Sequence, residues 1–482
     1  MKQISHNQML SSLHALSVQE NNEVYAVGGF VRDIILGRPV KDIDVVVTTN
    51  ADKFARKYSR LIKGDFVILD KENKIFRIIK KSTNNIYTVD ISDMRGKNIE
   101  TDLNLRDFTI NSIAVLLNGK PIKSNNKSFI DPANGIADIN KKIIRATYAG
   151  AFADDPLRIL RAYRLAATLN FTMDKTTEEL IEAYSFQLAR ISAERIKEEL
   201  FKIFSCPDSA GWISRLADAC IIEHIIPEVL LMKKSTDYYF HEHGLWEHSI
   251  KTLESLENIV YNIKYMFRKT AHKLNEHLAA IVTGEVNRLV ILKFCSLFHD
   301  AGKPAAISIE QDKVRFYGHE KKGAGIAVEI LKRLKSSSRE MRIAESVIGN
   351  HMRPANLSSA KCLSDRTIFR YFKDLSEEGI DVLLLSLADR YSYKCCNKIS
   401  PTKATSLNNQ LVFTKKMFFQ YYYRKNKINP PVLISGSELM SLFNIPEGPE
   451  IGRLLSILME AQADGRVKSK KEAINYLKEL IN

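Results

Sequence analysis

The sequence predicts an α+β protein, in which a small mixed sheet near the N-terminus is followed by an all-helical remainder. Between residues 24 and 118, short runs of β-branched and aromatic residues alternate with helix-like stretches, as in a mixed sheet with flanking helices. After about residue 138, apolar residues recur at a spacing of three to four, which indicates amphipathic helices. We expect four parts: a mixed-sheet domain over 1–150, a helical neck over 151–236, a histidine-rich helical domain over 237–400 and a helical tail over 401–482.

The composition is typical of a soluble globular protein. The 482 residues are 45% hydrophobic and 26% charged, and no apolar run is long enough to span a bilayer. The start of the chain lacks a signal-peptide pattern and the six cysteines form no Cys-x-x-Cys pair, so we expect reduced thiols and a cytoplasmic location. The formal net charge of +15 suits a phosphate-rich partner, and a merely basic surface is the alternative.

The first predicted strand, residues 24–27, ends at two glycines. Gly28 and Gly29 allow backbone N–H groups to approach a triphosphate closely, and the helix-like run after them carries Arg32. A glycine pair alone is most often a turn, so its meaning depends on the residues after it.

Two aspartates come next, at positions 42 and 44, just before three valines. In an extended strand, residues i and i+2 point to the same face, so Asp42 and Asp44 can hold a divalent cation together. Their hard oxygen ligands suit Mg²⁺. Glycines, arginine and aspartates in this order and spacing predict a site of nucleotidyl transfer.

Three further strands are expected at 66–69, 74–80 and 86–91, with a hairpin turn at Asn84-Asn85. The last of these strands carries Asp90 near its end. In a small sheet, Asp90 can lie beside the two aspartates of the earlier strand as a third catalytic carboxylate. An ordinary strand-end aspartate is the alternative.

These residues resemble the nucleotidyltransferase superfamily. The Gly-Gly-Phe-Val-Arg-Asp form at 28–33 narrows the resemblance to the head of bacterial class II tRNA nucleotidyltransferases and poly(A) polymerases. Residues 105–114 are similar to the family motif Arg-Arg-Asp-Phe-Thr-x-Asn-x-x-Ala, with Leu105 in place of the first Arg. The resemblance implies that Arg106 contacts the triphosphate, that Asp107 contacts the ribose hydroxyl and that Asn111 belongs to the same nucleotide site. Leu105 removes one phosphate or RNA contact from the expected set.

We expect residues 153–169 to form a helix that selects the base. On a helix, Asp155 and Arg158 are neighbours at i and i+3, and together they offer hydrogen-bond acceptors and donors. Such a pair matches the edges of cytosine and adenine and mismatches those of uracil and guanine. The resemblance implies that it is a protein template for CTP and ATP; a surface ion pair is the alternative. Arg161 and Arg164 continue the same face toward the triphosphate or the primer.

The segment between the third carboxylate and the Arg106 motif is short. Only 15 residues, 91–105, lie between Asp90 and Arg106. Full CCA-adding members of the family carry a flexible loop here, and members that add only CC lack it. We therefore expect CC addition, with a partner enzyme adding the terminal A, and full CCA addition as the open alternative.

The histidine-rich part contains histidines and aspartates in a distinctive order: His248, His299, Asp300, His319, His351 and Asp389. This order resembles the HD phosphohydrolase domain, whose ligands are His, His-Asp and Asp, with two further histidines for a second metal position. Imidazole with carboxylate suits Mn²⁺, Ni²⁺, Co²⁺ or Fe²⁺ better than Mg²⁺. A bound metal would generate a hydroxide for attack on phosphate, and the resemblance implies hydrolysis at tRNA ends. Structural histidines are the alternative.

Two stretches of the tail are rich in basic residues, and one of them is also rich in aromatic residues. The run 418–427 is basic and aromatic, and Arg466 is followed by Lys468, Lys470 and Lys471. Both suit RNA, through stacking and charge. The end of a buried amphipathic helix is an equal alternative.

The expected function is therefore that of a tRNA 3′-end nucleotidyltransferase that uses CTP and ATP on the tRNA acceptor end. Two metals held by Asp42 and Asp44 would activate the 3′-hydroxyl and stabilise the leaving pyrophosphate. A second, HD-type phosphohydrolase site is expected on the same chain. The alternatives are a poly(A) polymerase, and an RNA-binding metal phosphohydrolase whose head is inactive.

Overall fold

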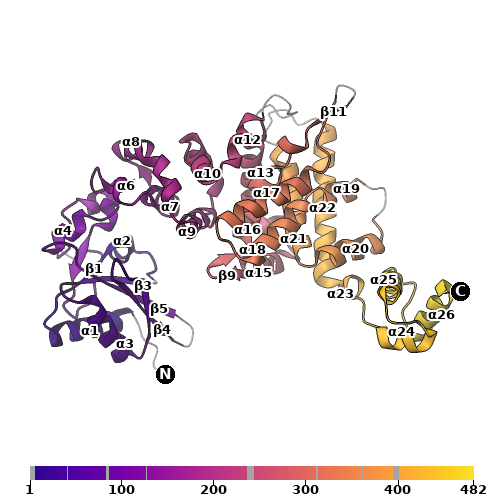
Figure 1. Cartoon of the computed structure of the whole chain (residues 1–482), viewed down its shortest axis with the longest axis horizontal. Helices are drawn as coiled ribbons and strands as arrows, with labels where there is room; N and C mark the ends of the chain where they lie inside the picture. The colour runs from indigo at the N-terminus through magenta and orange to yellow at the C-terminus, as the bar shows by residue number, and fades with distance from the viewer. Residues whose placement is uncertain are drawn as a thin grey trace. The chain divides into compact units, whose positions relative to one another are not determined.

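A computed structural model describes residues 6–40, 42–82, 86–125, 128–235, 244–310, 313–359, 363–393 and 401–481. It confirms the α+β class, with one mixed sheet near the N-terminus and a helical remainder (Figure 1). The chain divides into two compact units, Met1–Ile191 and Ser192–Asn482. The expected boundaries at 150, 236 and 400 stay predictions.

The sheet of the first unit has six strands in the order β3-β4-β5-β2-β1-β6. Their bounds are β1 Val24–Val27, β2 Asp42–Val47, β3 Asp65–Asp70, β4 Ile75–Lys81, β5 Ile86–Asp93 and β6 Ala114–Leu116. Strands β2 and β5 are parallel, and the other pairs are antiparallel. The predicted strands are confirmed, and the predicted hairpin turn at Asn84-Asn85 lies outside the described residues.

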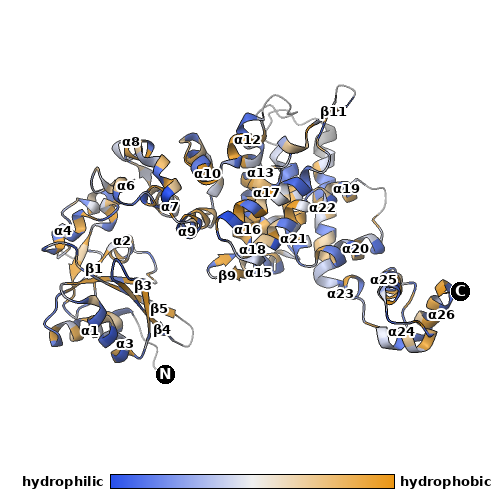
Figure 2. Ribbon diagram, in the orientation of Figure 1, coloured by the Kyte–Doolittle hydropathy of each residue, from blue (hydrophilic) through white to orange (hydrophobic). Residues whose placement is uncertain are grey.

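Alternation within the strands separates a core face from a polar face. On β2, Ile43 is buried while Asp42 is exposed, and on β5 Val89 and Ile91 are buried on either side of Asp90. Side chains point to opposite faces in turn along a strand, so the apolar residues form the core and the carboxylates line the other face. Figure 2 shows the apolar character of these strands.

Short helices surround the sheet: α1 His6–Gln19, α2 Gly28–Ile35, α3 Ala51–Ile62, α4 Ile99–Asn104, η1 Thr109–Asn111 and α5 Gly135–Lys141. Helix α3 is amphipathic, with Phe54 and Tyr58 buried on one side. The side chain of Asn50 accepts a hydrogen bond from the Lys53 N–H and caps its first turn. Helix α2 follows β1 directly and packs against both β1 and β2.

The next helices end the first unit: α6 Ala151–Asp154, α7 Arg158–Leu169, α8 Lys175–Tyr184 and η2 Ser185–Arg190. The short strand β7 Ile143–Ile144, before α6, pairs with β8 Thr172–Met173, after α7. The prediction that Asp155 and Arg158 lie on one helix was wrong. Asp155 has an extended backbone, with φ −145° and ψ 98°, because it precedes Pro156 and a proline disfavours the helical conformation of the residue before it.

The second unit is helical, with two short hairpins that the sequence did not predict. Its helices up to the tail are α9 Ala193–Phe204, α10 Ser209–Asp218, α11 Ile222–Ile225, α12 Glu228–Lys234, α13 Gly244–Tyr261, α14 Ile263–Phe267, α15 Ala271–Ala279, α16 Arg288–Phe298, α17 His319–Arg333, α18 Ser338–Gly349, α19 Arg353–Ser358, α20 Asp365–Leu375 and α21 Glu378–Ser392. The hairpins pair β9 Ile281–Thr283 with β10 Val286–Asn287, and β11 Ser308–Glu310 with β12 Lys313–Arg315. Helix α16 is central, and nearly all its residues are buried.

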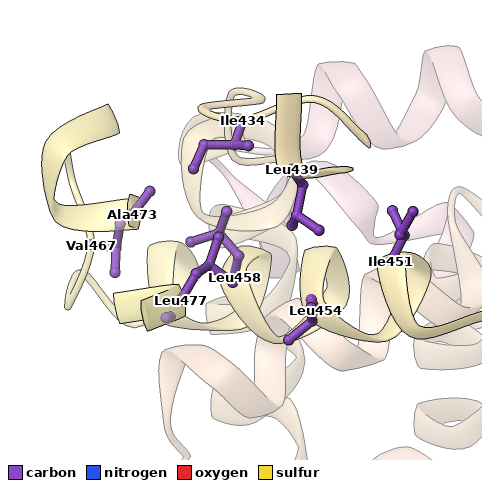
Figure 3. Packing of buried hydrophobic residues seen from close by; sticks show 9 residues of the cluster. Ile434, Leu439, Ile451, Leu454, Leu458, Val467, Ala473 and Leu477 are labelled. Atoms are coloured by element: carbon purple, nitrogen blue, oxygen red, sulfur yellow. The ribbon is translucent and has the colours of Figure 1, made fainter. Parts of the chain in front are cut away.

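The tail begins with α22 Pro401–Tyr423 and α23 Lys425–Ile428 and ends with α24 Gly436–Phe443, α25 Pro449–Ala463 and α26 Lys470–Ile481. The last three helices enclose a small apolar core of their own, around Leu439, Leu454, Leu458 and Leu477 (Figure 3). Among the helices of the described ranges, none has both the length and the apolar character that a membrane span requires.

Candidate functional sites

The strand register brings the three predicted carboxylates to one polar face of the sheet. Asp42 and Asp44 both lie on β2, two residues apart, and Asp44 is directly opposite Asp90 on the neighbouring parallel strand β5. The Thr88 hydroxyl, opposite Asp42, donates a hydrogen bond to the Asp42 carboxylate. The predicted common face of these residues is therefore confirmed.

Gly28 is the first residue of α2, directly after β1, and its backbone lies close to the polar face of the sheet. Its φ is +70°, a conformation that favours glycine. A Cβ at this position would lie 3.2 Å from Nη1 of Arg106 and 3.7 Å from Oδ2 of Asp44. An added Cβ would press on the Arg106 guanidinium, while its distance to Asp44 would be an ordinary contact, and the backbone conformation would strain it as well.

Two residues that no local sequence pattern indicates hold two of these side chains: Arg77 holds Asp90, and Asp102 holds Arg106. Arg77 on β4 is opposite Asp90 and donates from Nε and Nη2 to its two carboxylate oxygens, at 2.7 Å each. Asp102 is buried on α4 and accepts from Nε and Nη2 of Arg106, at 3.0 and 2.9 Å. A polar residue between Phe76 and Ile78 was the only available signal for Arg77, and its partner depends on the strand pairing.

The clustering of carboxylates changes the acidity of Asp44. Burial and the nearby Asp90 raise the pKa of Asp44 from 3.8 to about 6, and the guanidinium of Arg106 offsets only part of this. The carboxylate is therefore costly to keep ionised, and a cation at this face would relieve the cost. Such a position fits a divalent ion.

A chain of hydrogen bonds connects α2, η1 and α7. Arg32 donates from Nη1 to Oδ1 of Asn111 at 2.8 Å, and Asn111 donates from Nδ2 to Oδ1 of Asp107 at 3.1 Å. The other oxygen of Asp107 accepts from Nε and Nη2 of Arg161, at 2.9 and 2.6 Å. The structure thus joins four of the predicted nucleotide-site residues into one network.

Asp107 is the anionic centre of this network. Burial by itself would raise the pKa of Asp107, but the Arg161 guanidinium and the Asn111 amide hold that pKa well below its usual range. The carboxylate therefore stays ionised and acceptor-only at neutral pH, as a group that accepts a hydrogen bond from a hydroxyl requires.

Two cavities adjoin the carboxylates, of about 380 and 280 Å³. Gly29, Asp44, Asn111 and Arg161 line both of them. Arg32 and Arg164 line the larger cavity, while Asp90 and Arg106 line the smaller one. A cavity with several arginines and two or more carboxylates suits a triphosphate accompanied by a cation.

Arg158 begins α7 and Asp155 lies three residues before it, outside the helix. Arg161 and Arg164 of α7 are among the residues that line the two cavities, whereas Asp155 and Arg158 are not. The Asp155 carboxylate accepts from the Leu157 N–H at 3.2 Å. Arg158 donates to the Tyr148 hydroxyl at 3.1 Å and to the Leu105 carbonyl at 3.3 Å. Their assignment as a base template stays a prediction.

The six predicted residues of the second site converge in the interior of the second unit. His248 comes from α13, His299 and Asp300 follow α16, His319 begins α17, His351 follows α18 and Asp389 lies on α21. The ligand atoms of His248, His299 and Asp389 lie within 4.8 Å of one another, as do those of His299, Asp300 and His351. His319 Nε2 is 3.4 Å from His351 Nε2 and 3.3 Å from Oδ1 of Asp300.

Each imidazole is oriented by a contact at Nδ1. The Nδ1 atoms of His299, His319 and His351 lie 2.8, 2.8 and 2.7 Å from backbone carbonyls three residues earlier. A carbonyl accepts only, so Nδ1 carries the proton in each case and Nε2 presents its lone pair to the centre. This is the arrangement in which histidines ligate metals through Nε2.

The chemistry of this cluster fits a metal ion. Within the described part of the chain, the buried atoms His299 Nε2, Asp300 Oδ1 and Asp389 Oδ1 have no hydrogen-bond partner. Burial would lower the pKa of His248, but Asp300 and Asp389 outweigh it and raise that pKa to about 9. Burial and His299 lower the pKa of His351 to about 4. Four imidazoles and two carboxylates form a donor set for a transition metal.

Three parts of the chain match known families. Residues 24–145 match the family described as Poly A polymerase head domain, and residues 170–232 match the probable RNA and SrmB-binding site of polymerase A. Residues 245–394 match the HD domain. The three carboxylates of the sheet and the histidine site thus fall within matches to two different families, whereas Asp155, Arg158, Arg161 and Arg164 lie between the first two matches.

Relatives match along nearly the whole chain. The CC-adding tRNA nucleotidyltransferase of Geobacter sulfurreducens is 29% identical over 451 residues, which cover 94% of this chain and 90% of the relative. The A-adding tRNA nucleotidyltransferase of Deinococcus radiodurans is 27% identical, with 93% of each chain covered. The solved structure of the Thermotoga maritima CCA-adding enzyme complexed with tRNA covers all of this chain at a TM-score of 0.61 and 23% identity, which shows a shared fold.

Proposed function

This chain belongs to the family of tRNA nucleotidyltransferases and poly(A) polymerases and carries an HD domain, and from this premise we propose that it adds two cytidines to the 3′ end of tRNA. A partner enzyme would then add the terminal adenosine. The chain is a tRNA nucleotidyltransferase of the CCA type.

The observation that supports CC addition is the short connection between the third carboxylate and Arg106. Strand β5 ends at Asp93 and α4 begins at Ile99, so only residues 94–98 are irregular. The Arg95 N–H donates to Oδ1 of Asp102 at 2.9 Å, and the other oxygen of Asp102 holds Arg106. A short segment tied to the site in this way favours one fixed pocket over a pocket that switches from CTP to ATP.

The residues around the two cavities would divide the work of nucleotidyl transfer. Asp42 and Asp44 would hold Mg²⁺, which when bound activates the attacking hydroxyl and stabilises the leaving pyrophosphate. The triphosphate would be neutralised by Arg32, Arg106 and Arg161, because one guanidinium group can donate two parallel hydrogen bonds to phosphate oxygens.

The remaining groups would position the nucleotide. The Gly28 and Gly29 backbone admits the phosphates, and the ionised Asp107 accepts a hydrogen bond from the ribose. Asp155 and Arg158 would offer an acceptor and a donor to the cytosine edge. Holding the reactants in this way lowers the entropic cost of reaction.

We infer a second activity for the histidine site, that of a metal-dependent phosphohydrolase acting on phosphates at RNA ends. The observation that supports it is the convergence of Nε2 and carboxylate atoms described above. A transition metal held there by the four histidines, Asp300 and Asp389 would supply hydroxide at neutral pH. Lys303, which donates to Asp300, adds a positive charge beside the site.

The test offers the purified protein two substrates, tRNA without its CCA end and tRNA ending in CC. Each is incubated with CTP alone, ATP alone or both, and the product ends are sequenced. We expect two cytidines on the first substrate and nothing on the second. Adenosine on the CC-ending tRNA would contradict CC-only addition, and long adenosine tracts would indicate a poly(A) polymerase.

An Asp42→Ala variant and an Asp300→Ala variant separate the two sites. Incorporation that survives Asp42→Ala would show that the carboxylate face is not the catalyst. Hydrolysis of a terminal or cyclic phosphate that is unchanged by Asp300→Ala would contradict the hydrolase assignment. Each variant also serves as the control for the other, because its substitution lies in the other unit.

A further inference from the structure

The predicted basic aromatic run at the end of α22 is only partly a surface. Phe418 is fully buried, and its ring centroid lies 5.2 Å from that of Phe267. Tyr421 packs against Phe372, at 4.8 Å between ring centroids. The buried alternative therefore holds for the middle of the run, while Tyr423 at its end is 50% exposed.

Two other tyrosines are far more exposed. Tyr261 at the end of α13 is 88% exposed and Tyr265 on α14 is 77% exposed. Backbone hydrogen bonds continue from one helix to the next, from the Asn262 N–H to the Asn258 carbonyl and from the Met266 N–H to the Asn262 carbonyl. The tyrosines are thus one helical turn apart on the same side, so they project together.

Two hydrogen bonds connect the end of α22 to the segment that follows α14. The Tyr423 hydroxyl donates to the Lys269 carbonyl at 2.6 Å, and the Tyr422 hydroxyl donates to the Lys273 carbonyl at 3.4 Å. Ile263 and Phe267 are buried beneath, so α14 is anchored by its apolar side. The backbone that carries the three exposed tyrosines is therefore held in place by packing and hydrogen bonds.

The residues that neighbour these tyrosines along the chain are basic. Lys264, Arg268 and Lys269 are exposed on the α14 segment, and Arg424 and Lys425 follow Tyr423. No aspartate or glutamate occurs in residues 258–275, and none occurs in residues 390–437. Glu276, which is close enough to Tyr422 to affect its pKa, is paired with Lys273, so the net charge of this surface stays positive and complements a polyanion.

We propose that Tyr261, Tyr265 and Tyr423, with the surrounding lysines and arginines, bind unpaired bases of an RNA; we call these residues the tyrosine surface. Exposed aromatic rings stack on bases, and cations beside them contact the backbone phosphates. A paired stem hides its bases, so the surface would select loops or single-stranded ends. That the RNA is tRNA rests on the proposed function, whereas binding of unpaired RNA does not.

The test measures binding of the full chain to a short single-stranded RNA, a blunt RNA duplex of equal length and tRNA, by fluorescence anisotropy at several salt concentrations. The double variant Tyr261→Ala with Tyr265→Ala should raise Kd for the single strand and tRNA by about tenfold or more, with the salt slope unchanged. The double variant to Phe should keep wild-type Kd, because the rings remain.

Two further variants sharpen the test. Replacing Lys264 and Lys269 with Ala should flatten the slope of log K against log salt by about one per lysine. Tyr317→Ala is the matched control, since Tyr317 is 67% exposed but lies between β12 and α17, and its Kd values should equal those of the wild type.

Several outcomes would overturn the proposal: an unchanged Kd in the double Ala variant with an unchanged melting temperature, an equal loss in the Tyr317 control, or an equal loss on duplex RNA. Self-association that depends on Tyr261 would instead assign the surface to a second copy of the chain. If CTP incorporation fails in the wild type while RNA binding still depends on the tyrosines, the proposed function is wrong and the tyrosine surface stands.

Discussion

The carboxylate face and the histidine cluster are both candidate metal sites, but they differ in how complete they are. At the carboxylate face, Asp42 is exposed and Asp90 is already paired with Arg77. In the cluster, His299, Asp300 and His351 are buried, and their ligand atoms already lie within 4.8 Å. Among the described residues, the aspartates of the sheet form no group of three ligand atoms that close.

This difference indicates when each metal would bind. Mg²⁺ is usually held by one or two carboxylates together with waters and substrate phosphates. The carboxylate face therefore needs the nucleotide to complete its site. The histidine cluster supplies its own ligands, so a metal would be resident there before any substrate arrives.

The largest effect is expected from removing one ligand that the whole histidine cluster shares. Asp300→Ala should abolish the tightly bound transition metal, because Asp300 contacts four histidines of the set. Metal content after dialysis, measured by mass spectrometry, checks this. CTP incorporation should stay at the wild-type rate, and metal retained in the variant would show that the cluster does not depend on Asp300 to hold it.

At the carboxylate face, Asp44→Asn should abolish incorporation and stabilise the nucleotide-free protein. The folded pKa of Asp44, about 6, exceeds the ordinary 3.8. Between these pH values the folded protein keeps a proton that the unfolded chain has lost, so this contribution to stability falls as the pH rises. Above pH 6 the ionised carboxylate costs roughly 3 kcal/mol, at about 1.4 kcal/mol per pKa unit.

The measurement is the melting temperature of wild type and variant, without magnesium, at neutral pH and near pH 4. We expect the variant to melt higher at neutral pH and the gap to close in acid. A gap that does not change with pH would show that the charge of Asp44 is not the source of the instability.

A smaller effect is expected from Ser392, which orients His248. The Ser392 hydroxyl donates to the Asp389 carbonyl at 2.6 Å, so toward His248 Nδ1, 3.3 Å away, it accepts. Ser392→Ala should weaken metal binding by about tenfold, as loss of such an outer contact typically does. Competition with a chelator measures the affinity, and Ser392→Thr, which keeps the hydroxyl, should restore it.

The smallest effect concerns Arg77. Arg77→Gln removes a positive charge beside Asp90 and Asp44, so the carboxylate face should bind a divalent ion a few-fold more tightly on electrostatic grounds. Mn²⁺ titration followed by paramagnetic resonance checks this without turnover. Arg77→Lys keeps the charge and should leave the affinity unchanged, and equal shifts in both variants would point to structure instead of charge.

How far the sequence predicts each site depends on the range of the interactions. Asp42 and Asp44 share a face because of the two-residue period of a strand, which is local. The pairing of Arg77 with Asp90 depends on which strands are neighbours, and no local pattern contains that. The apolar spacing of 153–169 predicts a helix through Asp155, whereas Pro156 is a local signal that the helix is interrupted there.

The histidine cluster is the extreme case of long-range assembly. His248 and Asp389 are 3.2 Å apart at closest approach and come from two different helices. Helical periodicity alone would leave each histidine as an ordinary buried residue. Only the order of ligands in a known family grouped them, and the structure then supplied the Nδ1 contacts that orient the rings.

The separate core of α24–α26 has a consequence for how the end of the chain is attached. Its apolar residues, around Leu454 and Leu458, pack among themselves, whereas Glu460 on α25 is held by Arg366 and Arg370 of α20. Glu460 is buried but its two arginines are about half exposed, so ionic strength weakens these ion pairs in part and leaves the apolar packing intact. Concentrated salt should therefore loosen the docking of α25 on α20 before it unfolds the last three helices, so that attachment and folding of this segment respond to different solvents.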